Sequence, residues 1–146
     1  MAAKIIDVSV ATIRNTGSQR VSPLGFIFGR TVRAVDDEQV FQSEVIYAGA
    51  TGILPGQSLT VGVKKRLTIV HFDQESEGRV NQMLVFHADL KQRHIVLGSN
   101  EERPYSGPGN FKVQFNDIAG FQRFSVPYIA TADHKIEVVY TLDLFA

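Results

Sequence analysis

Hydrophobic and polar residues alternate along most of the chain, which is the pattern of β-strands with one buried face. The final run is the clearest, because Ile136, Val138 and Tyr140 fall on one side and Glu137 and Thr141 on the other. Runs of this kind predict strands over residues 6–10, 24–35, 39–48, 58–63, 66–72, 80–88, 94–97, 111–115, 121–129 and 135–145. Clusters of Gly, Pro, Asn and Asp separate them at intervals of about 8–12 residues, which is typical of antiparallel sheets. The pattern therefore predicts an all-β fold, and we expect one antiparallel β-sandwich domain over residues 1–146.

The alternation leaves open the secondary structure of residues 81–93 and the pairing of residues 66–73. Residues 81–93 nearly fit the 3.6-residue period of a helix, but the β-forming centre of this segment and its neighbours favour a strand. The runs 66–73 and 80–88 are separated by a short turn-forming stretch, and we expect them to form a hairpin. In that hairpin His71 would lie opposite Gln82.

The composition is that of an ordinary globular chain. It has 146 residues with 15 basic and 15 acidic side chains, and it contains neither Cys nor Trp. A chain of this length can bury enough surface to fold without disulfides or a metal. The lack of Cys excludes disulfides, cysteine nucleophiles and thiolate zinc sites. The balanced charge argues against a nucleic-acid partner, because such proteins need a basic surface.

Two His-X-Asp triplets, at residues 71–73 and 87–89, are the best candidates for a metal site. Residues two apart on a strand point the same way, so each triplet could present an imidazole and a carboxylate together. In the expected hairpin, however, His87 would lie roughly 17 Å from His71, at about 3.4 Å per residue. The two triplets could not then share an ion, and we expect half-exposed histidines and no metal or other cofactor.

The motifs of known catalytic classes are missing. The chain has no Gly-X-Ser-X-Gly elbow and no phosphate-binding loop, and the adjacent acids Glu101 and Glu102 would point apart. The cationic run 64–66 lies in a predicted strand, so its side chains alternate between faces and are typical of a guarded sheet edge. We therefore expect a protein that is not an enzyme.

Aromatic residues beside arginines are the remaining candidates for ligand contact. Arg103 and Tyr105 lie in an irregular stretch over residues 98–110, and loops of this length are often functional. Phe26 and Phe28 precede Arg30 in a predicted strand, where they belong either to the core or to a contact surface. An amphipathic ring beside a guanidinium suits a lipid or sugar headgroup.

Several short motifs resemble the aegerolysins, a family of small all-β proteins. Residues 11–21 resemble the family's first strand and its Asn-X-Gly-Ser-Gln type of turn, and residues 54–61 resemble a proline-led strand that follows it. Glu77 and Gly78 resemble an acidic-Gly step in one of the family's loops, and residues 136–142 resemble its closing strand. The transferable positions are Asn15, Gly17, Ser18, Gln19, Pro55, Glu77 and Gly78.

The resemblance implies a β-sandwich that recognises a membrane lipid headgroup, often of a sphingolipid. Aegerolysins commonly recruit a larger perforin-like partner, and bacterial members form the small half of binary insecticidal toxins. On this basis we expect a non-enzymatic lipid-recognition protein that is the small component of a two-component pore-forming toxin. The expected lipid-contact residues are Arg103, Tyr105, Glu77, Gly78, Phe26, Phe28 and Arg30.

Two other functions remain open from the residues alone. In a carbohydrate-binding lectin, Asn110, Asn116, Asp117 and Tyr128 would serve as the sugar contacts. The third possibility is a structural subunit of a virion or a secretion apparatus, since β-sandwiches are common building blocks of both.

The start of the chain and its hydropathy predict where the protein acts. Asp7 interrupts the first apolar run, so we expect no signal peptide. No stretch approaches the roughly 20 apolar residues of a spanning helix. We expect synthesis in soluble form, accumulation in the cytoplasm, release by a non-classical route and action at a target-cell membrane.

Overall fold

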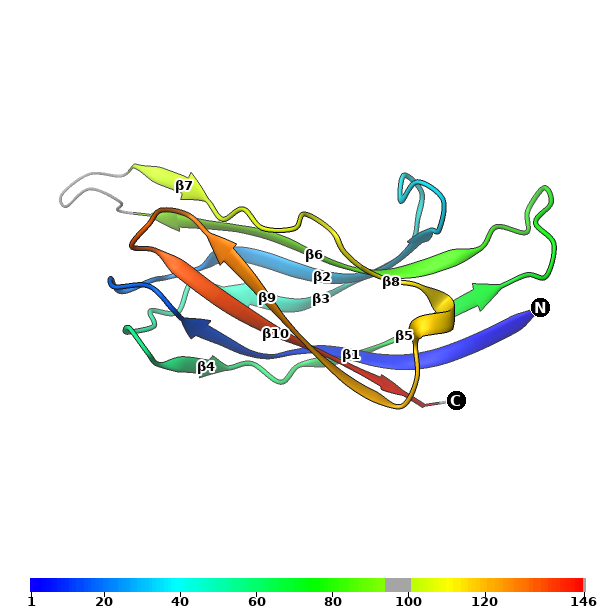
Figure 1. Cartoon of the computed structure of the whole chain (residues 1–146), viewed down its shortest axis with the longest axis horizontal. Coiled ribbons are helices and arrows are strands. Elements are labelled where there is room, and N and C mark those ends of the chain that lie inside the picture. The colour runs from blue at the N-terminus through cyan, green and yellow to red at the C-terminus, as the bar shows by residue number, and fades with distance from the viewer. Residues whose placement is uncertain (94–100, 146) are drawn as a thin grey trace.

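Two five-stranded antiparallel sheets pack face to face, so the prediction of an all-β sandwich is confirmed. The structure is a computed structural model of the chain and describes residues 1–93 and 101–145. The two layers and their connections are shown in Figure 1. The strand predicted over residues 94–97 lies outside the described residues. No helix in the described ranges has the length and hydropathy needed to cross a membrane.

The first layer, called the β1 sheet, consists of β1 (Ala2–Asn15), β4 (Ser58–Thr60), β5 (Lys64–His71), β9 (Phe121–Ile129) and β10 (Lys135–Leu144). Its order is β4–β1–β10–β9, and β5 also pairs with β1. The long β1 strand holds β5 along residues 2–9 and β4 along residues 12–14 of the same edge. One edge of this sheet is therefore β9, and the other edge is formed by β4 and β5, which lie one after the other along β1.

The second layer, called the β2 sheet, consists of β2 (Leu24–Arg33), β3 (Val40–Gly49), β6 (Gln82–Arg93), β7 (Glu102–Pro104) and β8 (Phe111–Val113). Its order is β3–β2–β6–β7, and β8 also pairs with β6. β7 pairs with residues 91–93 of β6 and β8 with residues 84–86, so the β6 edge between them carries no strand. A short 3-10 helix, η1 (Phe115–Asp117), follows β8.

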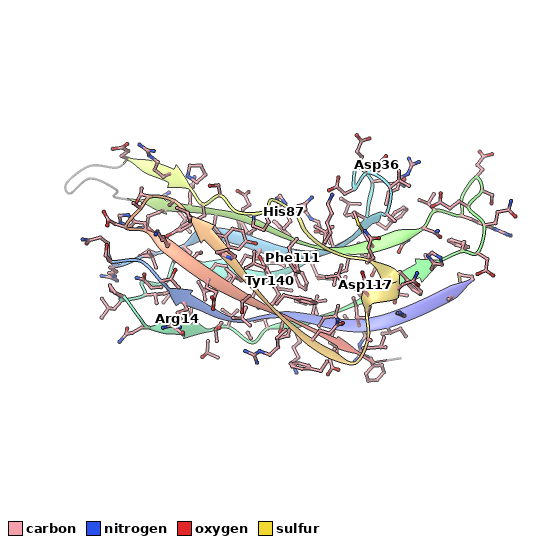
Figure 2. The ribbon with its side chains drawn as sticks, in the orientation of Figure 1. Arg14, Asp36, His87, Phe111, Asp117 and Tyr140 are labelled. Carbon is pink, nitrogen blue, oxygen red and sulfur yellow. The ribbon has the colours of Figure 1, made fainter. Side chains whose placement is uncertain are left out.

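The core lies between the two sheets. Alternate residues of β1 point into it, and Ile6, Val8 and Val10 have no exposed surface. Phe86 of the β2 sheet stacks on Tyr140 of the β1 sheet, with ring centroids 4.3 Å apart. Tyr140 is labelled near the centre of Figure 2. Each fully buried side chain of this size contributes about 1.5–3 kcal/mol through the hydrophobic effect, so this packing is the main force that joins the layers.

The predicted hairpin of residues 66–73 and 80–88 is wrong. β5 pairs with β1, and His71 lies opposite Ala2, whereas β6 pairs with β2 in the other layer. The connection between β5 and β6 therefore crosses from one sheet to the other. The alternation of side chains predicted which face of each strand is buried, but it carries no information about the neighbouring strand. The strand interpretation of residues 81–93 is confirmed, since β6 covers most of that segment.

The turn at residues 15–19 and the segment 54–61, which resemble aegerolysin motifs, meet at one end of the sandwich. Asn15 is fully buried; its side-chain amide donates to the carbonyl oxygens of Gln19 and Ile53 at 2.7 and 2.9 Å, and its Oδ1 accepts from the Gly17 N–H at 2.9 Å. The Gly56 N–H donates to the Asn15 carbonyl oxygen at 3.0 Å. The turn at residues 15–19 and the proline-led segment at 54–61 are thus one packed unit, and their residues have structural roles.

A side chain closes the seam between the β3 edge and the β5 edge. The Gln42 Nε2 donates to the Thr68 carbonyl oxygen at 2.6 Å, and the Gln42 Oε1 accepts from the Thr68 N–H at 3.2 Å. The amide thus replaces one residue of a paired strand. Strand edges with unpaired backbone groups otherwise attract other chains.

We expect Gln42→Ala to lower the free energy of unfolding by about 1 kcal/mol, because two hydrogen bonds at a partly hydrated site are replaced by water. Urea denaturation measures this change. Gln39→Ala is the matched control, since Gln39 is exposed at the start of the same region. Equal destabilisation by the two substitutions would show that the seam bond contributes nothing.

Candidate functional site

Phe26, Phe28 and Arg30 lie side by side on the outer face of the β2 sheet, and we call these three residues the aromatic ladder. Ile27, between the two Phe residues, points into the core and has no exposed surface, whereas Phe26 is 49% exposed. The interpretation of these Phe residues as core is therefore wrong. β2 alternates as a strand should, but its outward positions are aromatic where solvent-facing residues are usually polar.

The ladder has a stacked geometry. The Phe26 and Phe28 rings are stacked with centroids 6.1 Å apart, and the Arg30 guanidinium carbon lies 4.4 Å from the Phe28 centroid. The Arg30 Nε donates to the Ser43 hydroxyl at 3.0 Å, which holds the guanidinium over the ring. Cation–π stacking of this kind contributes about 0.5–1 kcal/mol at exposed sites and fixes the direction of the charge.

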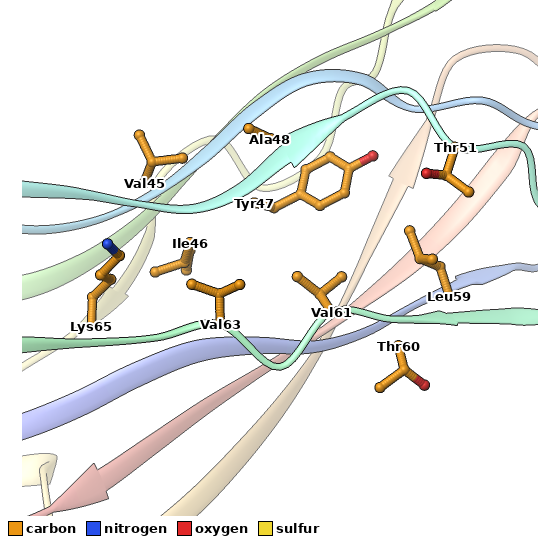
Figure 3. Close-up of a pocket in the computed structure, with 10 residues that line it drawn as sticks. All are labelled: Val45, Ile46, Tyr47, Ala48, Thr51, Leu59, Thr60, Val61, Val63 and Lys65. Atoms are coloured by element: carbon orange, nitrogen blue, oxygen red, sulfur yellow. The ribbon is translucent and has the colours of Figure 1, made fainter.

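The apolar surface continues from the ladder around the β3 edge. Val45 lies opposite Phe28, is 38% exposed, and also lines an open groove of about 500 Å³ between β3 and the β4–β5 edge. We call it the edge groove, and Figure 3 shows its lining side chains. Lys65 is the charged residue among them. The ladder and the groove together form one apolar strip, because Val45 pairs with Phe28 of the ladder and also lines the groove. The lining residues are Val45, Ile46, Tyr47, Ala48, Thr51, Leu59, Thr60, Val61, Val63 and Lys65.

His87 of β6 adjoins the ladder on its other side. Its ring lies 6.2 Å from the Phe28 ring, and its Nδ1 is 2.7 Å from the Asn110 Oδ1. The Asn110 Nδ2 donates in turn to the Asp37 carboxylate at 3.1 Å. The carboxylate accepts only, so the amide must present its oxygen to His87, and the His87 Nδ1 must donate. We call Asp37, Asn110 and His87 the polar relay; within the described residues no hydrogen bond engages the His87 Nε2.

The Asp37 carboxylate is held in its charged form. The hydrogen bond from Asn110 lowers the pKa of Asp37 below its ordinary 3.8, and Lys112, 3.2 Å away, lowers it further. Asp37 also has a positive φ of 52°, a conformation that Asp and Asn tolerate better than other side chains. Asp37 lies in the β2–β3 loop, in which Figure 2 labels Asp36, and its contacts with Asn110 and Lys112 join this loop to the chain around the start of β8.

We expect Asp37→Asn to weaken the loss of stability in acid. The folded pKa of Asp37 lies below its unfolded value, so its contribution is complete above pH 3.8 and is lost as the pH falls through the folded pKa. Asn keeps the positive φ and cannot titrate. Urea midpoints at neutral pH and below pH 3.8 should therefore differ less in the variant than in the wild type.

The acid dependence should not vanish altogether in that variant. Asp7 and Glu102 also have lowered pKa values, the first through its hydrogen bond from Arg66 and the second through that from Lys91. Asp117→Asn, on the exposed η1, is the control. If the urea midpoint of Asp37→Asn falls as much between neutral and acid pH as that of the wild type, the ionised Asp37 does not stabilise the folded state.

A cavity of about 370 Å³ opens where the β6 edge carries no strand, and we call it the β6 pocket. The chain between β7 and β8 runs beside β6 in Figure 1, and residues 105–107, 109 and 110 of this segment line the pocket. At Gly107 a Cβ atom would lie 2.6 Å from the Tyr128 ring, so this wall can approach the core only as glycine. Asp, Glu, Lys and Arg are missing from the described residues that line the pocket, which are His87, Ala88, Tyr105, Ser106, Gly107, Gly109, Asn110 and Tyr128.

The prediction of an exposed Tyr105 ring is wrong. Tyr105 is 7% exposed, its hydroxyl donates to the Gln92 Oε1 at 2.9 Å, and its backbone N–H donates to the Leu90 carbonyl oxygen at 2.9 Å. Burial raises the pKa of its hydroxyl, which stays a donor. The ring forms a wall of the β6 pocket instead of contacting solvent. Arg103, on β7, is exposed and lies 3.8 Å from Glu101.

The other predicted contact residues lie apart from this face. Glu77 and Gly78 are exposed in the connection between β5 and β6, at the opposite end of Figure 1 from β7, so the structure does not bring them together with Arg103. Two of the four proposed sugar contacts, Asn110 and Tyr128, line the β6 pocket. The other two lie on η1, outside the pocket lining.

The two His-X-Asp triplets lie in different sheets, the first at the end of β5 and the second in β6. His71 stacks on Phe115 with ring centroids 5.1 Å apart, and His87 belongs to the polar relay. Within residues 1–93 and 101–145 no three His, Asp or Glu side chains gather as metal ligands. The run 64–66 lies on the β5 edge as predicted, where Arg66 pairs with Asp7 at 3.0 Å.

His87 and Asp37 were missed as members of a site by sequence reasoning. His87 was considered with Asp89 as a metal-binding pair and then interpreted as a half-exposed strand histidine, and Asp37 belongs to one of the turn-forming clusters that separate the predicted strands. Their connection through Asn110 spans 73 residues from Asp37, and no local pattern encodes it. The one usable signal was the glycine-rich segment 106–110 after a strand, since such segments let a backbone approach other groups closely.

Comparison with known proteins finds no match: no protein-family model, no curated protein and no solved structure corresponds to this chain. The resemblance to the aegerolysins stays a prediction based on short motifs. Function is therefore argued from the geometry of the outer β2 face.

Proposed function

We propose that this chain is a non-enzymatic membrane-lipid recognition protein, with the aromatic ladder and the edge groove as its contact surface. The observation that carries the proposal is the half-exposed Phe26 stacked on Phe28, on the outer face of an open sheet. Exposed apolar surfaces of this kind mark interaction sites. At a membrane, aromatic rings enter the interface and are relieved of contact with water.

Charge placement supports the same surface. Arg30 is held over Phe28, so its guanidinium lies where inserted rings would meet the phosphate layer of a membrane. The chain has no net charge, with 15 basic and 15 acidic residues, so general attraction to anionic lipids would contribute little. Binding would therefore depend on the apolar strip and on particular headgroups.

The resemblance to the aegerolysins supplies the second part of the proposal. In that family the small sandwich binds a membrane lipid, often a sphingolipid, and a larger perforin-like partner makes the pore. We propose the same division for this chain, which would make it the small component of a two-component toxin acting at a target-cell membrane.

Sedimentation with vesicles tests the lipid proposal. We expect the protein to sediment with phosphatidylcholine vesicles that contain a sphingolipid, and the composition series should include sphingomyelin and ceramide phosphoethanolamine. Leakage of an entrapped dye should stay low without a partner protein. Failure to sediment with every composition would remove lipid recognition as the function.

A further inference from the structure

We infer that the β6 pocket binds one neutral sugar ring, so that the recognised headgroup is a glycosyl group. This inference rests on the proposed function for its membrane setting, but the pocket itself is argued from its own residues. Its volume of about 370 Å³ is at the lower end of the range of small-molecule sites. A ligand of one or two rings therefore fits it better than an extended chain.

The lining of the pocket favours hydroxyl groups over charged groups. Asp37 and Lys112 pair with each other behind Asn110 and do not line the pocket. A phosphate or a primary amine would therefore lose its hydration inside the pocket without gaining an opposite charge, which is costly. Sugar hydroxyls are neutral, and they both donate and accept.

The polar relay gives the pocket a fixed acceptor. Asp37 orients Asn110, and the Asn110 Oδ1 accepts from the His87 Nδ1, so in the neutral imidazole the lone pair lies on Nε2. The backbone N–H groups of Gly107 and Gly109 donate no backbone hydrogen bond within the described part of the chain. An imidazole acceptor and backbone donors in one lining match the hydroxyls of a pyranose, which both donate and accept.

The remaining side chains of the lining provide mainly apolar contact, because their hydroxyl groups are engaged elsewhere; that of Ser106 donates to the Ile129 carbonyl oxygen at 3.2 Å. The Tyr105 and Tyr128 hydroxyls are engaged in the core, by Gln92 at 2.9 Å and by the Tyr140 hydroxyl at 2.6 Å. Their rings therefore present carbon and hydrogen atoms to the pocket, as sugar sites do to the C–H face of a ring. Phe28 lies against His87, so a bound glycosyl group would sit beside the aromatic ladder at the membrane surface.

Methyl hexosides and glycolipid vesicles test the inference. We expect methyl glucoside, galactoside or mannoside to shift the His87 and Tyr128 resonances in NMR titrations. We also expect vesicles with a hexosylceramide to sediment more protein than vesicles with sphingomyelin. His87→Phe should weaken hexoside binding and sedimentation with hexosylceramide vesicles about tenfold each, because it removes the ring nitrogens. His71→Phe, at the half-buried histidine stacked on Phe115, should change neither.

The outcomes separate the inference from the proposed function. If no hexoside binds the wild type and hexosylceramide gives no advantage over sphingomyelin, the sugar pocket is refuted while lipid recognition stands. If a hexoside binds but no vesicle sediments the protein, the sugar pocket is supported and its ligand is a free glycan. The proposal of membrane recognition is then refuted. If His87→Phe has a lower melting temperature than the wild type, Asn110→Ala serves as a second variant, because it removes the hydrogen bonds of the relay. Binding unaffected in both variants would overturn the inference.

Discussion

Phe26→Ser should reduce sedimentation with sphingolipid vesicles at least about tenfold, while the protein stays folded. Phe26 is 49% exposed, so its ring contributes little to the folded state, but the proposed membrane contact would bury it. Burial of a Phe side chain contributes about 1.5–3 kcal/mol, and 1.4 kcal/mol corresponds to a factor of ten in affinity. A vesicle titration of the variant against the wild type measures the loss.

Phe121→Ser is the matched control for this experiment. Phe121 is 60% exposed and begins β9 in the opposite sheet. It is therefore an exposed Phe like Phe26, but it lies outside the proposed contact surface. We expect it to sediment like the wild type. Equal losses in the two variants would mean that binding follows general hydrophobicity, and the assignment of the contact surface to the ladder would fail.

Asn15→Ala should lower the free energy of unfolding by about 3 kcal/mol, because it leaves buried backbone groups without their partners. The Asn15 side chain makes three hydrogen bonds to the backbone, to Gln19, Ile53 and Gly17, from a fully buried position. For a chain of this size that change corresponds to a fall of roughly 10 °C in the melting temperature. Thermal unfolding followed by circular dichroism measures it.

A second variant and a control accompany this measurement. Gly17→Ala should destabilise comparably, because a Cβ atom there would lie 2.2 Å from the Asp133 carbonyl oxygen, which is backbone and cannot turn away. Asn116→Ala, at an exposed position of η1, should stay within about 0.5 kcal/mol of the wild type. If Asn15→Ala also stays in that range, the turn does not depend on its buried amide.

The predicted strands agree with the structure where the alternation is long. β9 and β10 were predicted within one residue of their observed bounds, since apolar residues recur at alternate positions of both. Thr141, expected on the polar side of β10, is buried. β7 was missed, because its three residues lie at an exposed edge and have no apolar face to reveal them. The pairing of β5 was wrong for a related reason: a strand's own sequence does not specify its neighbour.

The candidate site was predicted only in part. Phe26, Phe28 and Arg30 were recognised as a possible contact surface, but strand spacing alone could not tell the outer face of a sheet from its inner face. Tyr105 was proposed as a lipid contact because it lies beside Arg103 in a long irregular stretch, yet its ring is buried and its hydroxyl donates to Gln92. Burial of a single ring depends on which elements cover it.

By itself, the sequence determined the strand content, the turns and the absence of cysteine chemistry, because these follow from local alternation and composition. Tertiary structure alone decided which faces meet and which residues become neighbours. Asp37, Asn110 and His87 come from a loop, from the segment before β8 and from β6, and Asn110 lies 73 residues from Asp37 and 23 from His87. Such contacts arise when two sheets pack to bury their apolar faces, and that packing is a property of the whole chain.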